Sequence, residues 1–143
     1  MKKLLLPAAI LAITSSLFAQ PQSKKTTDVA KFSKETIDFG KIKQGIPAKG
    51  TFVVTNISDA PLIIEAANPT CGCTISDYTK SPIAPGKTGE INATYNAANG
   101  GHFEKHLTVK FAGVDEMKTI TFTGDVLSAE EFDKLQAPAP AVK

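Results

Sequence analysis

FEKHLTVKF at residues 103–111 and KTITFTGDV at residues 118–126 are two runs in which apolar and polar side chains alternate. In the first run, Leu107, Val109 and Phe111 fall on one side, and a segment that contains glycine and aspartate separates the two runs. An alternation with a period of two is typical of a β-strand with one buried face. The two runs therefore predict a pair of half-buried strands joined by a turn.

Five further runs have the same character. They cover residues 32–39, 49–56, 62–67, 74–78 and 88–95. Segments rich in glycine, proline, asparagine or aspartate separate them, and these residue types favour turns. Seven short strands with no long amphipathic helix between them predict one all-β domain over residues 31–127. We expect a seven-stranded antiparallel immunoglobulin-like β-sandwich.

The first 19 residues have the pattern of a secretory signal peptide. Lys2 and Lys3 precede an apolar run over residues 4–18, and the small residue Ala19 follows. This order predicts cleavage between Ala19 and Gln20. The apolar run is shorter than the roughly 20 residues that a membrane-spanning helix needs. We therefore expect an exported protein, periplasmic or extracellular, with no stable membrane anchor after cleavage.

The segments that flank the predicted sandwich differ from it in composition. Residues 20–30 are polar and lack periodicity, which predicts a flexible leader. Ser128 and Glu131 have the spacing of a helix capping box. Residues 128–143 are therefore expected to form a short helix followed by an extended tail rich in proline and alanine.

The charge of the chain argues against one class of partner. The sequence carries a formal net charge of +2, from 16 Lys or Arg against 14 Asp or Glu, and no arginine occurs. Because Lys2 and Lys3 belong to the predicted signal peptide, the mature chain is neutral. Without arginine or a lysine cluster, the bidentate contacts that proteins make with phosphates and guanines are missing. We expect no nucleic-acid partner.

Sequence patterns of catalysis are missing too. The sequence has no glycine-rich phosphate loop and no Ser-His-Asp set on recognisable elements, and its acidic residues are scattered rather than paired. We therefore expect a protein that is not an enzyme and has no cofactor.

Cys71-Gly72-Cys73 holds the two cysteines of the chain and is its one motif with chemical character. One interpretation is structural: the cysteines are buried, or they form a disulfide, which an oxidising compartment favours. In a regular strand their Cα atoms would lie about 6.6 Å apart, near the upper limit for a disulfide. A closed pair would therefore need a turn at Gly72 and would be strained.

Two other interpretations use free thiols. A redox-active dithiol would exchange with client proteins, but the strand predicted after Cys73 provides no helix N-terminus to lower a thiol pKa. Lys80 and the histidines are then the only cations that could help. A metal site would bind Cu(I) or Zn, with Cys71, Cys73 and His102 as candidate ligands. His102 and His106 would lie about 13 Å apart on one strand, so only one of them can join.

Several short motifs together resemble a known family. In chain order they are Ile37-Asp38-Phe39-Gly40, Phe52-Val53-Val54-Thr55-Asn56, Pro61-Leu62-Ile63-Ile64, Cys71-Gly72-Cys73-Thr74, Ile83-Ala84-Pro85-Gly86 and Gly124-Asp125-Val126. Over residues 32–126 the chain resembles the exported bacterial family of domain of unknown function 1573. That family is similar to the immunoglobulin-like domains of the ASH, major-sperm-protein and hydin group. The resemblance implies a seven-stranded sandwich in the cell envelope or outside it, and it implies no reaction and no catalytic residues.

These observations predict a non-enzymatic binding or structural module of the cell envelope. It would present sheet edges and loops to a protein partner, with the loop at residues 69–74 as its candidate functional site. The alternative is a thiol site at Cys71-Gly72-Cys73 that binds Cu(I) or Zn or exchanges disulfides.

Overall fold

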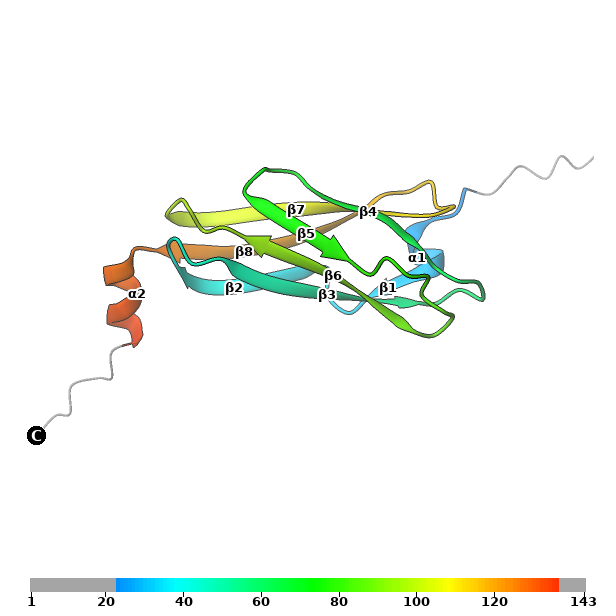
Figure 1. Ribbon diagram of the computed structural model, residues 1–143, viewed down its shortest axis with the longest axis horizontal. Coiled ribbons are helices and arrows are strands. Elements are labelled where there is room, and N and C mark those ends of the chain that lie inside the picture. The colour runs from blue at the N-terminus through cyan, green and yellow to red at the C-terminus, as the bar shows by residue number, and fades with distance from the viewer. Residues whose placement is uncertain (1–22, 137–143) are drawn as a thin grey trace, which may run out of the picture.

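The chain folds into two four-stranded β-sheets that form an elongated sandwich, with a short helix at each end (Figure 1). The computed structural model describes residues 23–136. Its elements, in chain order, are α1 (Thr26–Val29), β1 (Ala30–Phe32), β2 (Thr36–Lys43), β3 (Ala48–Asn56), β4 (Ile64–Pro69), β5 (Thr74–Tyr78), β6 (Thr88–Tyr95), β7 (Gly101–Phe111), β8 (Lys118–Leu127) and α2 (Ala129–Gln136).

The first sheet has the strand order β1-β3-β6-β5, and the second has the order β2-β8-β7-β4. Paired strands run antiparallel, except that β2 runs parallel to β8. The all-β, two-sheet prediction is thus confirmed. The predictions of seven strands and of a purely antiparallel arrangement are wrong, because the structure has eight strands and one parallel pair.

The eighth strand arises because the run predicted over residues 32–39 divides. β1 pairs with β3 in the first sheet as far as Phe32, and β2 pairs with β8 in the second sheet from Thr36 onward. The linking residues 33–35 move the chain from one sheet to the other without reversing its direction, which makes β2 parallel to β8. Periodicity cannot reveal this crossing, since strands of both sheets bury one face.

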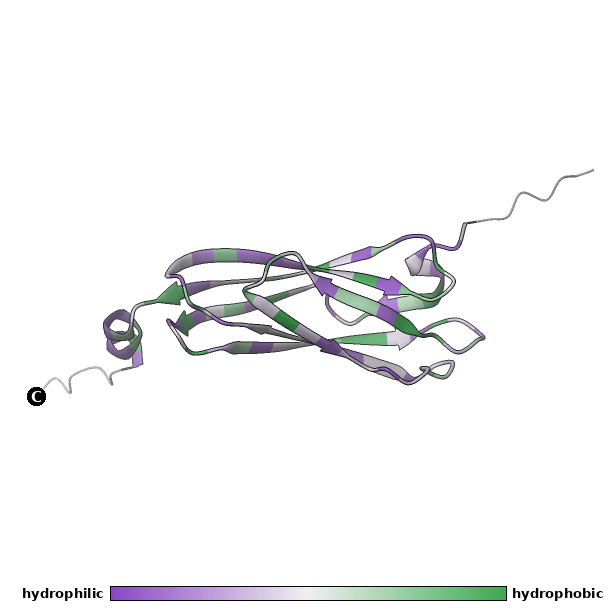
Figure 2. Ribbon diagram, turned by 45° about the horizontal axis from the view of Figure 1, so that its top comes forward, coloured by the Kyte–Doolittle hydropathy of each residue, from purple (hydrophilic) through white to green (hydrophobic). Residues whose placement is uncertain are grey.

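Hydrophilic and hydrophobic residues alternate along the strands (Figure 2), and the apolar side chains form the buried core between the two sheets. Phe52 and Ile91 of the first sheet are fully buried, as are Leu107 and Phe111 of the second. Removing such side chains from water is the main favourable contribution to folding. The core therefore lies along the whole length of the sandwich, as the sequence pattern predicted.

Four aromatic rings join the two sheets towards the α2 end. Tyr95 of β6 stacks on Phe103 of β7 with 4.2 Å between ring centroids. Phe39 of β2 packs against Phe122 of β8 with 5.7 Å between centroids, and Phe122 lies edge-on to Phe103. Such pairs add about 0.5–1.5 kcal/mol each beyond the area that they bury. This aromatic cluster fixes the spacing of the sheets at that end.

Two glycines leave room for these rings. A Cβ atom on Gly50 would lie 2.7 Å from Phe39 Cε1, and one on Gly124 would lie 2.9 Å from Phe103 Cε1. Both distances are shorter than a carbon–carbon contact allows. Gly50 and Gly124 therefore let the rings rest directly on the backbone of β3 and β8.

The N-terminal flank differs from the prediction. The expected flexible leader at residues 20–30 includes α1, and Thr26, Val29 and Ala30 are buried. The backbone N–H of Thr26 donates to Glu116 Oε2 at 2.8 Å, and its hydroxyl donates to the Glu116 carbonyl at 3.2 Å. These bonds attach the segment to the loop between β7 and β8, a long-range contact that local polarity does not reveal.

The C-terminal helix is confirmed. The Ser128 N–H donates to Glu131 Oε2 at 3.1 Å, and the Glu131 N–H donates to Ser128 Oγ at 3.3 Å, which completes the capping box. The Ser128 hydroxyl also donates to Glu131 Oε2 at 2.9 Å, and its bond together with that of the Ser128 N–H holds the pKa of the Glu131 carboxyl below its ordinary value. The predicted signal peptide at residues 1–19, with its cleavage site between Ala19 and Gln20, and the tail at residues 137–143 lie outside the described residues. Within residues 23–136, neither helix has the length and apolar character needed to cross a membrane.

Asn56, at the end of β3, is fully buried and connects two loops at the α1 end. Its amide nitrogen donates to the carbonyls of Ala60 at 2.7 Å and Ile83 at 2.8 Å. Its amide oxygen accepts from the Ser58 N–H at 2.9 Å and the Ser58 hydroxyl at 2.8 Å. One side chain thereby provides hydrogen-bond partners both for the loop that follows β3 and for the segment that precedes β6.

We expect Asn56→Ala to lower the free energy of unfolding by about 2–3 kcal/mol, because it leaves buried polar partners unpaired. Asn92→Ala is the matched control. Asn92 is exposed and accepts one bond from Thr51, so its loss should cost about 0.5 kcal/mol or less. Urea denaturation of both variants measures the difference, and equal effects would contradict the role given to Asn56.

Candidate functional site

The candidate site is the segment that crosses from β4 in the second sheet to β5 in the first. The Thr70 N–H donates to the His106 carbonyl at 3.1 Å, and the Asn96 N–H donates to the Cys73 carbonyl at 3.1 Å. Each end of the crossing is thus bonded to a different sheet. The strand predicted at residues 74–78 is confirmed with the same bounds, as β5.

Cys71 and Cys73 lie in a turn within this crossing. Their sulfur atoms are 2.05 Å apart, which is bonding distance, and their Cα atoms are 5.3 Å apart. The Thr74 N–H donates to the Cys71 carbonyl at 3.4 Å and closes the turn around Gly72. Both cysteines are half-buried, and Gly72 is exposed. The turn that a closed pair would require at Gly72 is therefore present.

Two hydroxyls of β5 attach this strand to β4 in the opposite sheet. The Ser76 hydroxyl donates to the Ala67 carbonyl, and the Tyr78 hydroxyl donates to the Glu65 carbonyl at 2.7 Å. The bonds close one side of the sandwich along β5, the strand that begins directly after the cysteine turn. No sequence signal pointed to them, because the apolar Ile75 faces solvent while Ser76 and Tyr78 share the other face of the strand.

The structure gives the cysteine pair no cationic help from Lys80. The Lys80 ammonium lies 3.3 Å from the centre of the Tyr78 ring and 3.8 Å from Asp77 Oδ1. These contacts are at the far end of β5 from Cys73. The segment that follows Cys73 is a strand and not a helix, so the thiolate-stabilising features of redox-active cysteines are not assembled there.

The two histidines lie on β7 and bond to residues of the second sheet. His102 Nδ1 is 3.0 Å from Asp125 Oδ1. His106 Nδ1 is 3.0 Å from Thr121 Oγ1, and its Nε2 is 3.5 Å from Glu104 Oε1. In the part of the chain that the structure describes, no three His, Cys, Asp or Glu side chains converge to hold a metal ion. The structure therefore brings Cys71 and Cys73 together but does not add His102 to them.

The family model for DUF1573, described as a protein of unknown function, matches residues 30–126. This chain belongs to the DUF1573 family. The match spans the sandwich from β1 to the end of β8 and includes the cysteine turn. It confirms the resemblance that the sequence motifs carried.

Solved structures show that the fold of this DUF1573 domain recurs elsewhere. A protein of unknown function from Porphyromonas gingivalis W83 matches with a TM-score of 0.61 and 12% identity, over 78% of this chain and 51% of that one. An ASH/PapD-like domain of human CEP192 matches with a TM-score of 0.57 and 12% identity, over 82% and 98% of the two chains. The Vibrio cholerae VesB protease matches with a TM-score of 0.54 and 17% identity, over 71% and 33%.

These likenesses show the fold alone. This chain spans about half of the Porphyromonas protein and a third of the protease. The CEP192 domain confirms the suspected similarity to the ASH group. No curated protein matches this chain by sequence.

We expect the double variant Ser76→Ala/Tyr78→Phe to loosen the cysteine turn, because it removes both hydroxyls that attach β5 to β4. Stability should fall by about 1–3 kcal/mol, and amide hydrogen exchange at residues 70–78 should rise more than in the rest of the sandwich. Ser81→Ala, at an exposed position after β5, is the control. Exchange that rises uniformly over all strands would contradict a local role for these hydroxyls.

Proposed function

We propose that this DUF1573 protein is an exported, non-enzymatic binding module of the cell envelope, and that its loop at residues 69–74 contacts a protein partner. The observation that carries the proposal is the anchoring of this loop. Backbone bonds to His106 and Asn96 hold its two ends, while Gly72 at its tip is exposed. An exposed loop on a rigid scaffold loses little conformational entropy on binding.

Two further features support a role without catalysis. His102 and His106 bond to Asp125 and Thr121 on the neighbouring strand β8, on the solvent side of the second sheet. Phe103 and Leu107, which alternate with these histidines, fill the interior instead. Side chains on an open sheet face do not exclude water from a substrate, which catalytic sites generally need.

A disulfide between Cys71 and Cys73 is part of the proposal. Export would place the pair in an oxidising compartment, where disulfides persist. Cys73 packs against the core, and the turn at Gly72 brings the Cα atoms of Cys71 and Cys73 to 5.3 Å, within the range that disulfides span. The bond would then fix the path of the loop at the point where a partner meets it. The alternative is a thiol site that binds Cu(I) or Zn or exchanges disulfides, and the half-exposed Cys71 is the observation in its favour.

Mass spectrometry of protein from the envelope fraction tests export and cysteine oxidation together. We expect the chain to begin at Gln20, and we expect alkylation under denaturing conditions to label no cysteine before reduction and both cysteines after it. A chain that begins at Met1 in the cytoplasm would contradict export. Two cysteines alkylated without reductant, or copper or zinc that copurifies and disappears in Cys71→Ser/Cys73→Ser, would favour the thiol site instead.

A photo-crosslinking residue in place of Gly72 tests the loop as a contact surface in intact cells. The structure has nothing within 4 Å of a Cβ atom at Gly72, so this position accommodates a side chain. We expect a crosslinked adduct of one discrete mass. The matched control places the same residue at Asp59, which is exposed on the loop after β3 at the opposite end. Equal adducts from both positions, or none from Gly72, would contradict the proposal.

A further inference from the structure

The crossing of the chain from β1 to β2 leaves part of β3 without a neighbour. β1 pairs only with Val54, Thr55 and Asn56 of β3, and the Ser33 N–H then donates to the Val53 carbonyl. Backbone groups alternate in direction along a strand, so the N–H and C=O groups of Lys49 and Thr51 face the same side as that carbonyl. Within residues 23–136, no strand pairs with them on that side. The first half of β3 is an open sheet edge.

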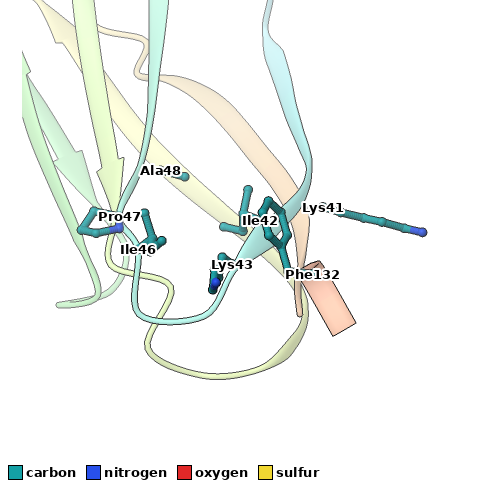
Figure 3. A pocket seen from close by; sticks show the side chains of 7 residues that line it. All are labelled: Lys41, Ile42, Lys43, Ile46, Pro47, Ala48 and Phe132. Carbon is teal, nitrogen blue, oxygen red and sulfur yellow. The ribbon is translucent and has the colours of Figure 1, made fainter. Parts of the chain in front are cut away.

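The groove between this open edge and β2 is filled in its middle and hollow at its α2 end. In the middle, Ile37 and Phe39 of β2 lie over Gly50 of β3. Further along, a cavity of about 220 Å³ remains between β2, the turn that precedes β3, and α2 (Figure 3). Its apolar walls are Ile42, Ile46, Pro47, Ala48 and Phe132.

The size of the cavity points to its occupant. Clefts that hold drug-sized ligands measure roughly 300–1,000 Å³, so this one is better matched to a single bulky side chain. Ala48 shares its face with the buried Tyr95, with which it pairs. A partner residue placed opposite Ala48 in a paired strand would point the same way. The open edge and the cavity thus form one continuous binding surface.

The charge around this groove is positive. Residues 31–49 contain the lysines Lys31, Lys34, Lys41, Lys43 and Lys49 against the acids Glu35 and Asp38. Glu35 is paired with Lys118 at 2.7 Å and Lys43 with Asp133 of α2 at 2.7 Å, which leaves Lys31, Lys34, Lys41 and Lys49 against the single carboxylate of Asp38. Lys41 lines the cavity and extends away from its apolar walls in Figure 3. Acidic partners are therefore favoured, while two copies of this lysine-bearing edge repel each other.

We propose that this groove is a second binding site, which takes an extended, acidic polypeptide segment with one bulky apolar side chain. The segment pairs with Lys49 and Thr51 of β3 as an added strand, continues the line that β1 leaves at Phe32, and inserts its apolar side chain beside Ala48. Backbone pairing supplies affinity, and the cavity and lysines supply selectivity. The inference deepens the binding role proposed above and rests on it, but it uses a surface separate from the cysteine turn.

One wall of the cavity is able to adjust to the side chain that enters. Phe132 belongs to α2, which has no buried residue. An ion pair of 2.7 Å between Lys43 and Asp133 ties the helix to β2, and Asp133 is mostly exposed. Such surface pairs contribute only about 0–1 kcal/mol. The helix can therefore shift without a large loss of stability.

Fluorescence anisotropy with labelled synthetic peptides tests the proposal on the purified protein. The probe is a short peptide that alternates valine and glutamate around one central leucine. We expect it to bind, and we expect exchange of the central leucine for serine to weaken binding about tenfold or more. Exchange of the glutamates for lysines should weaken binding by a similar factor. Equal binding of all three peptides, or no binding of any, would overturn the proposal.

Variants of the protein then locate the site. Thr51→Pro removes the edge N–H, and Thr51→Val keeps it, so only the proline variant should lose the peptide. Ala48→Phe should block the cavity, and Lys49→Glu should weaken binding more than Lys87→Glu, which changes an exposed lysine before β6. Thermal unfolding confirms that each variant is folded. In the wild-type complex, amide exchange should slow at Lys49 and Thr51, and unchanged exchange there would overturn the added strand.

Analytical ultracentrifugation tests whether a second copy of this chain, instead of a peptide, occupies the groove. Self-association that Thr51→Pro abolishes would assign the groove to a second copy and overturn the peptide proposal. Failure of these peptide tests would leave the Gly72 crosslinking result unaffected, so failure of this inference is distinguishable from failure of the binding role proposed above.

Discussion

The aromatic cluster between the sheets is the contact on which the α2 end of the sandwich depends. Tyr95 and Phe103 stack across the interior. Tyr95 is the last residue of β6 and Phe103 lies near the start of β7, so the loop between these strands connects the two rings. Directly after Tyr95, the Asn96 N–H bonds to the Cys73 carbonyl. The position of the cysteine turn is thus set by the depth at which Tyr95 packs. A shift of that ring would move the backbone that holds the turn, because close-packed interiors transmit such displacements.

The division of the first strand has an equally wide effect. A chain that continued along β3 would cover the whole edge of the first sheet and leave the second sheet with three strands. By crossing at residues 33–35, the chain instead gives each sheet four strands. It also places Phe39 over Gly50. Within residues 23–136, the crossing leaves the first half of β3 without a paired neighbour on one side, and the lysines beside it disfavour edge-to-edge pairing between copies of the chain.

The alternation of apolar residues was sufficient to predict most strands and the buried faces, and the spacing of Ser128 and Glu131 was sufficient to predict the capping box. Such local patterns were insufficient wherever a strand pairing or a contact depended on residues far apart in the sequence. The parallel pairing of β2 and the attachment of Thr26 to Glu116 both involve partners 84–90 residues away, and no local pattern encodes them. The cysteine turn was visible as a motif, but His102 looked like a ligand only because its bond to Asp125 on another strand was unknown. The open edge of β3 had no sequence signal, because it exists only where β1 ends before it has paired with the whole of β3.

The cysteine turn and the β3 groove share one scaffold. Asn96 binds the Cys73 carbonyl, whereas the next two residues bind the turn before β3: the Gly45 N–H donates to the Ala97 carbonyl at 2.9 Å, and the Gln44 side chain donates to the Ala98 carbonyl at 2.9 Å. Ala97 is fully buried and has a φ of 51°, a conformation that costs a non-glycine residue about 1 kcal/mol or more. The fold tolerates that cost because the surrounding bonds leave the segment no alternative path. Two surfaces that lie on different sides of the sandwich are therefore held in a fixed relation by one short loop, and a partner that extends around the α2 end would contact both.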